Sequence, residues 1–463
     1  MSIQSQTTNC EPEDEQSVID SIITATPPPP PTARIHKVPR MVRDSDDYDK
    51  YYVPKVVSIG PHHFRNPKLE FVQKLKPVFT MKLLQDEATL RSLYIKLGAP
   101  EMVKELRNFY EEGSTNDFRD PVFTKIMLLD SCFILYFIRF ISGEKPENCQ
   151  ELKTHQIVFI HEDMFLLENQ IPFKVLKEVM KLLSDEYCYI SKIALLIYGN
   201  ILAPERPKTK WFCIKNAKSC LEESKKELIE SEPDHLLHLL HRRLTKKMKD
   251  GKKDFRSKQD YRCTFRNVNE LMDVGIHFKP SETMSLAHIE FLKGKWWFSA
   301  NVKLPPINVD DSTKPMLLNL VAYEMCSHDA YDAGVTSYIC LLDSLIDHPE
   351  DVKVLRKAGV LENSLGSDKE VAKLFNEIGT DLVPNNLAYL EAKNMIQRHY
   401  KSRRNTLFAQ LKHEYVKSPW AFLGLVGALI ALFLTGVQTY FTVWSPKGDC
   451  DGLCKSLKHN HHL

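Results

Sequence analysis

The 463-residue sequence lacks most of the features that assign a chain to a biochemical class. It has no large excess of charge: Lys and Arg number 62, Asp and Glu 60, and the formal net charge is +2. Nothing in this balance indicates a nucleic-acid partner. The first residues, MSIQSQTTNCEPEDEQ, are polar and acidic, and no Asn-x-Ser/Thr sequon occurs. A secretory signal peptide is therefore not expected, and a cytosolic body is favoured.

The sequence also lacks the common catalytic motifs. There is no Walker A sequence, no GxGxxG, no GxSxG and no CxxC pair. His161-Glu162 begins like a zinc-protease motif, but Phe165 stands where the second histidine would be needed. These absences predict a protein that is not an enzyme and has no cofactor.

The cysteines show no spacing that indicates a disulfide framework. The chain has 11 of them, and Cys132 lies in the apolar run LLDSCFILYF, where a thiol usually behaves as a small core side chain. A reducing compartment fits this pattern best. Cys450 and Cys454 lie near the C-terminus, where pairing, a weak metal site with the neighbouring histidines, and an unstructured tail at 445–463 all stay open.

One long uncharged run is present, between Lys417 and Lys447. Its helix at 419–444 exceeds the roughly 20 apolar residues that cross a bilayer. Aromatic residues at both ends are typical of the two headgroup levels. We therefore predict a single membrane-spanning helix bound to the lipid bilayer. The residues expected to form this anchor are Trp420, Gly424, Gly427, Ala428, Tyr440 and Trp444.

Two further questions concern this helix. Gly424 and Ala428 form a small-xxx-small pair that would permit weak self-association, although chance also explains such a pair. Basic residues are denser before the helix than after it, which predicts a cytosolic body and a tail outside or in a lumen. The membrane itself, plasma membrane or endomembrane, stays open. The flanking basic residues are Lys401, Arg403, Arg404, Lys412 and Lys417 before, and Lys447, Lys455 and Lys458 after.

Two other apolar stretches, 122–142 and 187–204, are interrupted by charges such as Asp130 and Lys192. Their uncharged runs are too short to span a bilayer, and both are interpreted as buried core. The rest of the pattern predicts a mainly α (α+β) fold. A disordered segment at 1–48 contains the run Pro27–Pro31 and precedes a helical body at 49–415. That body includes a basic loop at 242–262 and a small β insert at 275–310.

Three groups of side chains are candidates for chemistry. Cys132 and His161 contain the parts of a nucleophile and its base, and the residues from Glu162 to Glu168 form an acidic cluster. Either set would serve an unrecognised hydrolase or transferase, although a buried, inert thiol is the simpler interpretation. His235, His238 and His241 recur on one helix and would supply part of a metal site, or simply a polar helix face.

Six ordered blocks resemble one family. They include VPKVVSIGPHHF, LLDSCFILYF, EDMFLLENQIPFKVL, FRNVNELMDVGIHFK, LPPINVDDSTKPMLLNLVAYEMC and YICLLDSLIDHPEDVKVLRKAGVLENSLGSDKEVAKLFNEI. Together they resemble the plant family of domain of unknown function 247, from about Pro54 to the apolar helix. Family members usually have Asp-Gly-Cys-Phe where this chain has Asp130-Ser131-Cys132-Phe133.

The resemblance implies a land-plant protein with a C-terminal transmembrane helix and no established enzymatic activity. Some grass members are implicated in pollen self-incompatibility, which suggests recognition or signalling. We therefore expect a membrane-anchored, non-enzymatic module with protein partners. The alternative is a hydrolase or transferase that uses Cys132 and His161 or the acidic cluster.

Overall fold

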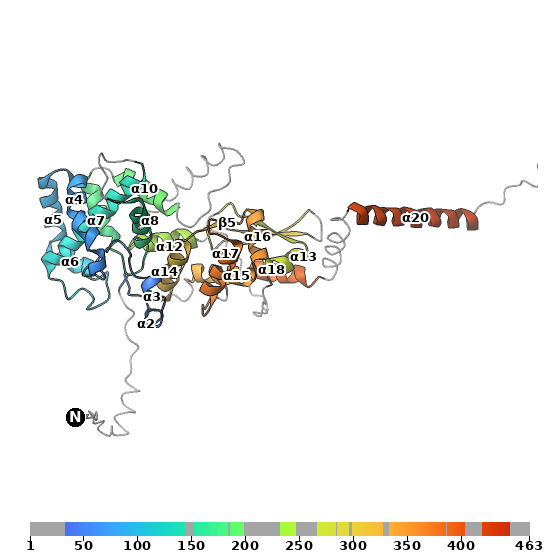
Figure 1. Ribbon diagram of the computed structural model, residues 1–463, viewed down its shortest axis with the longest axis horizontal. Helices are drawn as coiled ribbons and strands as arrows, with labels where there is room; N and C mark the ends of the chain where they lie inside the picture. Colours follow the sequence, from blue (N-terminus) through green and yellow to red (C-terminus); the bar gives the residue numbers. More distant parts are fainter. Residues whose placement is uncertain are drawn as a thin grey trace, which may run out of the picture.

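The computed structural model describes the body and the C-terminal apolar helix (Figure 1). The described residues are 33–143, 152–183, 186–198, 232–246, 266–283, 285–295, 299–326, 333–385, 387–402 and 419–444. The body is elongated, with an N-terminal lobe of helices at one end and a C-terminal lobe of helices and short strands at the other. Helices α12 (Leu236–Thr245) and α14 (Thr313–Cys326) lie between the lobes. One continuous cluster of buried apolar side chains extends from Ile35 to Ile396 and forms the core of both lobes.

The N-terminal lobe is built around helix α7 (Asp120–Ile141), which packs against several of the described helices. These neighbours are α4 (Glu70–Leu84), α5 (Glu87–Leu97), α6 (Pro100–Arg107), α9 (Phe173–Leu182) and α10 (Glu186–Tyr198). Helix α8 (Thr154–Asp163) and the short helix η1 (Pro67–Leu69) complete the lobe. Because α7 is apolar on nearly all sides, it can be stable only when other helices surround it.

Helix α7 is long and apolar enough to cross a membrane, yet 78% of its apolar window is buried inside the body. The prediction that this run is core is confirmed. The same holds for α10, where Ile193 is fully buried and Ile197 is 5% exposed.

The C-terminal lobe combines helices with two small sheets. Its helices are α13 (Val268–Asp273), α15 (Gly334–Leu345), α16 (Pro349–Ala358), α17 (Asp368–Gly379) and α18 (Leu390–Tyr400). In one sheet β3 (Ala300–Leu304) pairs in parallel with β1 (Ile276–Pro280) and antiparallel with β2 (Glu290–Lys293). In the other, β4 (Ile307–Val309) pairs in parallel with β5 (Leu361–Asn363). A mainly α fold with a small β insert is confirmed, and β5 is a strand that the sequence did not predict.

The predicted boundary at residue 49 is wrong for residues 33–48. Ile35 and Val38 are buried, and the Ile35 backbone N–H donates to the Phe109 carbonyl at 2.7 Å. This segment forms α2 (Arg40–Arg43) and leads into α3 (Tyr48–Tyr51). The apolar side chains of this segment have no regular spacing, so their periodicity was too weak to indicate that the segment pairs with Tyr110. Residues 1–32, with the proline run, lie outside the described residues.

Two other predicted segments are described only in part, and a third is not described. Arg242 and Arg243 of the predicted basic loop belong to α12, and residues 247–262 are not among those described. The last part of the predicted helical body, which extends to residue 415, is described to residue 402 and contains α18. The tail at 445–463 is also outside the described residues.

Helix α20 (Pro419–Trp444) differs from α7 in its surroundings (Figure 1). It also is long and apolar enough to cross a membrane, but 0% of its apolar window is buried. Trp420 is 83% exposed and Trp444 73%, and the ring of Tyr440 stacks on Trp444 with centroids 6.4 Å apart. A Cβ added at Gly424 or Gly427 would meet no described atom within 4 Å.

Candidate functional site

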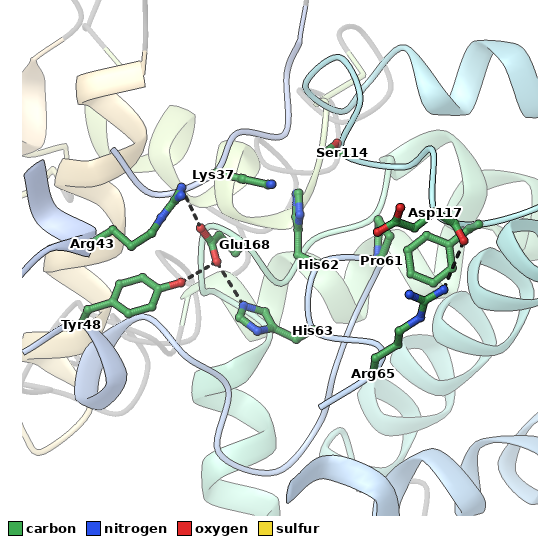
Figure 2. Close-up of a pocket in the computed structure, with 11 residues that line it drawn as sticks. Lys37, Arg43, Tyr48, Pro61, His62, His63, Arg65, Ser114, Asp117 and Glu168 are labelled. Atoms are coloured by element: carbon green, nitrogen blue, oxygen red, sulfur yellow. Dashed lines mark hydrogen bonds and ion pairs between the residues drawn. The ribbon is translucent and has the colours of Figure 1, made fainter. Parts of the chain in front are cut away.

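A polar pocket of about 340 Å³ opens beside the start of the described chain (Figure 2). Four segments contribute to it: the α2–α3 region, the loop after Gly60, the loop before α7, and the connection between α8 and α9. Its lining residues are Lys37, Arg43, Tyr48, Pro61, His62, His63, Arg65, Ser114, Asp117, Phe118 and Glu168.

The floor of the pocket is fixed by a polar network between the segments 55–60 and 163–170. The Asp163 carboxylate accepts the backbone N–H groups of Lys55, Val56 and Val57 at 2.9, 2.7 and 2.9 Å. Burial nevertheless raises the pKa of Asp163 to about 6 despite these donors. The network holds an irregular, buried segment in one conformation by satisfying its backbone groups.

Asn169 continues the same network. Its side-chain carbonyl accepts the Ile59 N–H at 2.6 Å, and its amide donates to the carbonyls of Val57 and Asp163 at 3.0 and 2.8 Å. All three hydrogen bonds are buried. A single amide side chain therefore joins the two segments whose ends carry pocket residues.

Gly60 then turns the chain into the pocket. Its φ of +79° lies in the left-handed region, and a Cβ at this position would overlap the Gln170 carbonyl oxygen. Its N–H donates to Oδ2 of Asp130 at 2.7 Å. The following residues, Pro61, His62 and His63, consequently reach the pocket lining in a fixed orientation.

Glu168 is the central acidic group of the pocket (Figure 2). It accepts the Val38 N–H and the Tyr48 hydroxyl, each at 2.8 Å. Arg43 lies 3.6 Å from Oε1, and His63 Nε2 lies 3.2 Å from Oε2, without the alignment of a good hydrogen bond. Burial acts to raise the pKa of Glu168, but these partners outweigh it and lower the pKa to about 2. The carboxylate is therefore ionised and already compensated by its neighbours.

His62 differs from His63. Its Nε2 atom is buried and has no hydrogen-bond partner within the part of the chain that the structure describes. Burial, assisted by the nearby Lys37, lowers the pKa of His62 to about 4, so the imidazole is neutral near pH 7. Its ring meets Tyr110 edge-on at 5.8 Å. The site thus contains a polar group prepared for a hydrogen bond that the described protein does not supply.

Two cationic side chains complete the lining. Figure 2 shows the Lys37 ammonium directed towards His62, and Lys37 forms no ion pair with any described residue. Arg65 donates to the Asp117 carbonyl at 3.1 Å and lies over the Phe118 ring at 4.9 Å. The pocket therefore presents hydrogen-bond donors and positive charge, which suit the binding of an anionic group. Its lining includes no cysteine.

The structure does not bring the predicted nucleophile and base together. Cys132 is fully buried within α7, where burial raises the pKa of its thiol to about 12. His161 lies in α8 against the Phe165 ring, at 5.7 Å. A thiol in this environment stays protonated and inaccessible, and neither residue lines the pocket.

The predicted acidic cluster is divided among separate roles. Glu162 pairs with Lys55 at 2.9 Å, Asp163 holds the backbone as described above, and only Glu168 lines the pocket. The cluster therefore contributes one ionised group to the site rather than a pair of interacting carboxyl groups.

The histidine triplet surrounds an aromatic ring. The rings of His235, His238 and His241 lie 5.5, 5.9 and 5.2 Å from that of Tyr323. Each also has a polar partner: the Arg34 carbonyl at 3.1 Å, Asp234 at 3.0 Å and Glu324 at 2.8 Å, respectively. Across the described ranges no group of three or more His, Cys, Asp or Glu side chains is arranged to hold a metal ion.

Sequence reasoning missed most of the pocket. Lys37, Arg43, His62, His63 and Arg65 were not candidates, because they come from irregular segments without a spacing rule. The available signal was the Gly-Pro-His-His sequence at 60–63, where a turn is followed by two adjacent imidazoles.

An α-rich body with a small β insert, a polar pocket and an exposed apolar helix defines the class: a mainly helical protein with one long apolar helix outside its body. A family model described as a plant protein of unknown function, DUF247, matches residues 35–434. The chain belongs to this plant family, as the sequence blocks indicated.

Two curated relatives from Arabidopsis thaliana match along nearly their whole length. A UPF0481 protein is 28% identical over 429 residues, which covers 87% of this chain and 85% of the relative. A putative UPF0481 protein is 24% identical over 494 residues, with 89% and 91% covered. No solved structure matches the chain. The pocket histidines and Glu168 come from two of the blocks that carry the family resemblance, GPHHF and LLENQIP.

Proposed function

We propose that this chain is a membrane-anchored, non-enzymatic recognition protein, held by α20 and displaying its helical body to the cytosol. The observation that carries the proposal is the contrast between two helices of equal apolar length. The body buries 78% of the apolar window of α7, whereas it buries none of that of α20. An apolar helix of 26 residues needs a non-aqueous environment, and a bilayer supplies it.

The side chains of α20 support a bilayer as that environment. Trp420 lies at one end, and Tyr440 and Trp444 at the other, as expected for rings at the two headgroup levels. The excess of basic residues before the helix supports a cytosolic body.

The surface of the body supports a protein partner. Phe71 and Val78 stand one heptad apart on α4 and are 56% and 44% exposed, and Tyr94 and Ile95 on the adjacent α5 are 42% and 72% exposed. Large apolar and aromatic side chains of this kind are enriched at protein interfaces.

Membrane attachment is tested by alkaline extraction of membranes from cells that express the full chain and a variant lacking residues 419–463. The full chain should stay with the membrane pellet, and the shortened chain should be released. Release of both would refute the anchor. Protease protection of tags at both ends tests orientation: only the N-terminal tag should be digested on sealed cytosol-side-out vesicles.

Recognition is tested by proximity labelling from a labelling enzyme fused to the N-terminus. A reproducible partner set that is lost when Phe71 and Ile95 are changed to Ser would support the proposal. Labelling indistinguishable from that of a membrane-anchored fluorescent protein would contradict it.

A further inference from the structure

We propose that the pocket between Lys37, His62 and Arg65 binds the phosphate group of a small phosphate ester. This function goes beyond membrane anchoring and does not depend on it. Some charged groups in the pocket are already paired with protein groups, and others are left for a ligand.

The matched charges surround Glu168. Its two oxygens receive the Val38 N–H and the Tyr48 hydroxyl, while Arg43 and His63 lie at ion-pair distance. Because these donors compensate its charge, the Glu168 carboxylate repels an anionic ligand only weakly and needs no further hydrogen-bond donor from a ligand. Arg43 is likewise occupied, since it also donates to the Val38 carbonyl at 2.8 Å.

The groups with few or no partners line the same cavity as Glu168. The Lys37 ammonium forms no ion pair with a described residue, and the Arg65 guanidinium forms one hydrogen bond to a backbone carbonyl. The buried Nε2 of His62 is without a described partner. Two cations and one neutral imidazole, which donates in the tautomer protonated at Nε2, therefore line the same cavity, and this combination matches an oxyanion with two negative charges.

The choice of phosphate over carboxylate rests on charge and on shape. A carboxylate neutralises one of the two cations, whereas a phosphate monoester carries nearly two negative charges at neutral pH and has three oxygens for three donors. The pocket, at about 340 Å³, lies at the lower end of the range for small-molecule sites, so the group attached to the phosphate is small.

The remaining carboxylate favours an ester that carries hydroxyl groups. Asp117 lies on the exposed rim, where its charge opposes a bare anion but accepts hydrogen bonds from hydroxyls. A phosphorylated polyol offers a phosphate group to Lys37 and Arg65 and hydroxyl groups to Asp117. Such a group occurs free in the cytosol and also as the headgroup of a lipid, and the experiment separates these two sources.

The first test is isothermal titration of the purified full chain, in detergent, with inositol monophosphate and with inorganic phosphate. Saturable binding of the ester, stronger than that of inorganic phosphate, is expected. Lys37→Met and Arg65→Met should each weaken binding at least about tenfold, because each removes a charge-assisted hydrogen bond. Arg65→Lys, which keeps the charge, should lose less than Arg65→Met.

The matched control is Lys357→Met. Lys357 is an exposed lysine on α16 in the other lobe, and its replacement should leave the affinity within about twofold of wild type. Thermal midpoints of all variants are measured alongside, because these side chains lie outside the core and their loss should not unfold the body. Absence of saturable ester binding by the folded wild-type chain would overturn the proposal, as would equal weakening by Lys357→Met.

The source of the ester is tested in nanodiscs. Discs of phosphatidylcholine alone are compared with discs that also contain a phosphatidylinositol phosphate, and the affinity for soluble inositol monophosphate is measured in both. A lower apparent affinity in the second discs, abolished by Lys37→Met, identifies a lipid headgroup as the occupant. Equal affinity in both identifies a free phosphate ester.

Discussion

The ammonium group of Lys76 donates to Oδ1 of Asp130, 54 positions further along the chain, where both side chains are buried. Lys76 also donates to the Ser58 carbonyl, and the other oxygen of Asp130 accepts the Gly60 N–H at 2.7 Å. Burial raises the pKa of Asp130 and lowers that of Lys76, while each partner opposes the shift of the other. The pair joins α4 to α7 and ties both helices to the loop that carries the pocket histidines.

Replacing one member of this pair should be strongly destabilising. Asp130→Asn leaves the Lys76 ammonium buried without a counter-charge, which costs about 3–5 kcal/mol of unfolding free energy. Urea denaturation of the full chain in detergent measures the change. Lys125→Met, at an exposed position of the same helix, should change the unfolding free energy by less than about 0.5 kcal/mol. An Asp130→Asn variant as stable as wild type would show that the ion pair between Lys76 and Asp130 does not contribute to the stability of the fold.

Gly60→Ala should lower the free energy of unfolding by more than the strained backbone conformation alone explains. A left-handed φ costs a residue other than glycine about 1–3 kcal/mol, and at Gly60 the new Cβ also overlaps the Gln170 carbonyl. Gly143 has a φ of +87°, and a Cβ added there would meet no described atom within 4 Å, so Gly143→Ala is the matched control. The unfolding free energy should fall by about 1 kcal/mol at Gly143 and by at least about 3 kcal/mol at Gly60. Equal losses would mean that the loop moves away from Gln170 freely.

Stability should fall as the pH drops from about 6.5, in part because of His235. Burial, with a smaller effect of His238, lowers the pKa of His235 from 6.5 to about 3 in the folded chain. Between these values the unfolded chain binds a proton that the folded chain does not, so acid favours unfolding. The loss at pH 5 relative to pH 7 is about 2 kcal/mol from this group, and it levels off below pH 3.

The measurement is the unfolding free energy at several pH values for wild type and His235→Asn. Asn retains an acceptor for the first turn of α12, which His235 caps through the His238 N–H at 3.2 Å. The variant should therefore show a shallower slope between pH 5 and pH 7. His155→Asn, at an exposed position of α8, should leave the slope unchanged. Parallel profiles for wild type and His235→Asn would contradict the assignment.

A charge at the centre of α20 should weaken membrane attachment more than one at its end. Ile430→Lys places an ammonium group near the middle of the helix, where insertion is disfavoured by about 3 kcal/mol. Val443→Lys lies one residue before the end, where the side chain reaches the interface. Alkaline extraction should release a larger fraction of Ile430→Lys than of Val443→Lys. Identical retention of both variants would argue that α20 is held by protein rather than lipid.

The sequence predicted those elements whose patterns are local. The helical body follows from its apolar periodicity, and the buried α7 was distinguished from a membrane span by charges such as Asp130. The partner of the buried Asp130 carboxylate could not be predicted, because Lys76 belongs to another helix and no spacing rule links Lys76 to Asp130.

The pocket and the short elements depend on contacts between distant segments. Strand β5 is three residues long and exists because it pairs with β4, more than 50 positions earlier. Lys37 reaches His62 only because Ile35 and Val38 are buried against the body. Only Glu168 was weighed in advance, as part of an acidic cluster in which Glu162 proved to pair with Lys55 and Asp163 to hold the backbone.

The side chain of Asn319, fully buried in α14, spans three parts of the chain. It accepts the Leu167 N–H at 2.8 Å and donates to the carbonyls of Tyr51 and Pro315, both at 2.8 Å. Leu167 adjoins Glu168 of the pocket, and Tyr51 ends α3, so a helix between the lobes is bonded directly to the pocket's supporting backbone. The geometry of the pocket therefore depends on the packing of both lobes and not on the N-terminal lobe alone. The pocket should be lost in the same unfolding transition in which the two lobes separate.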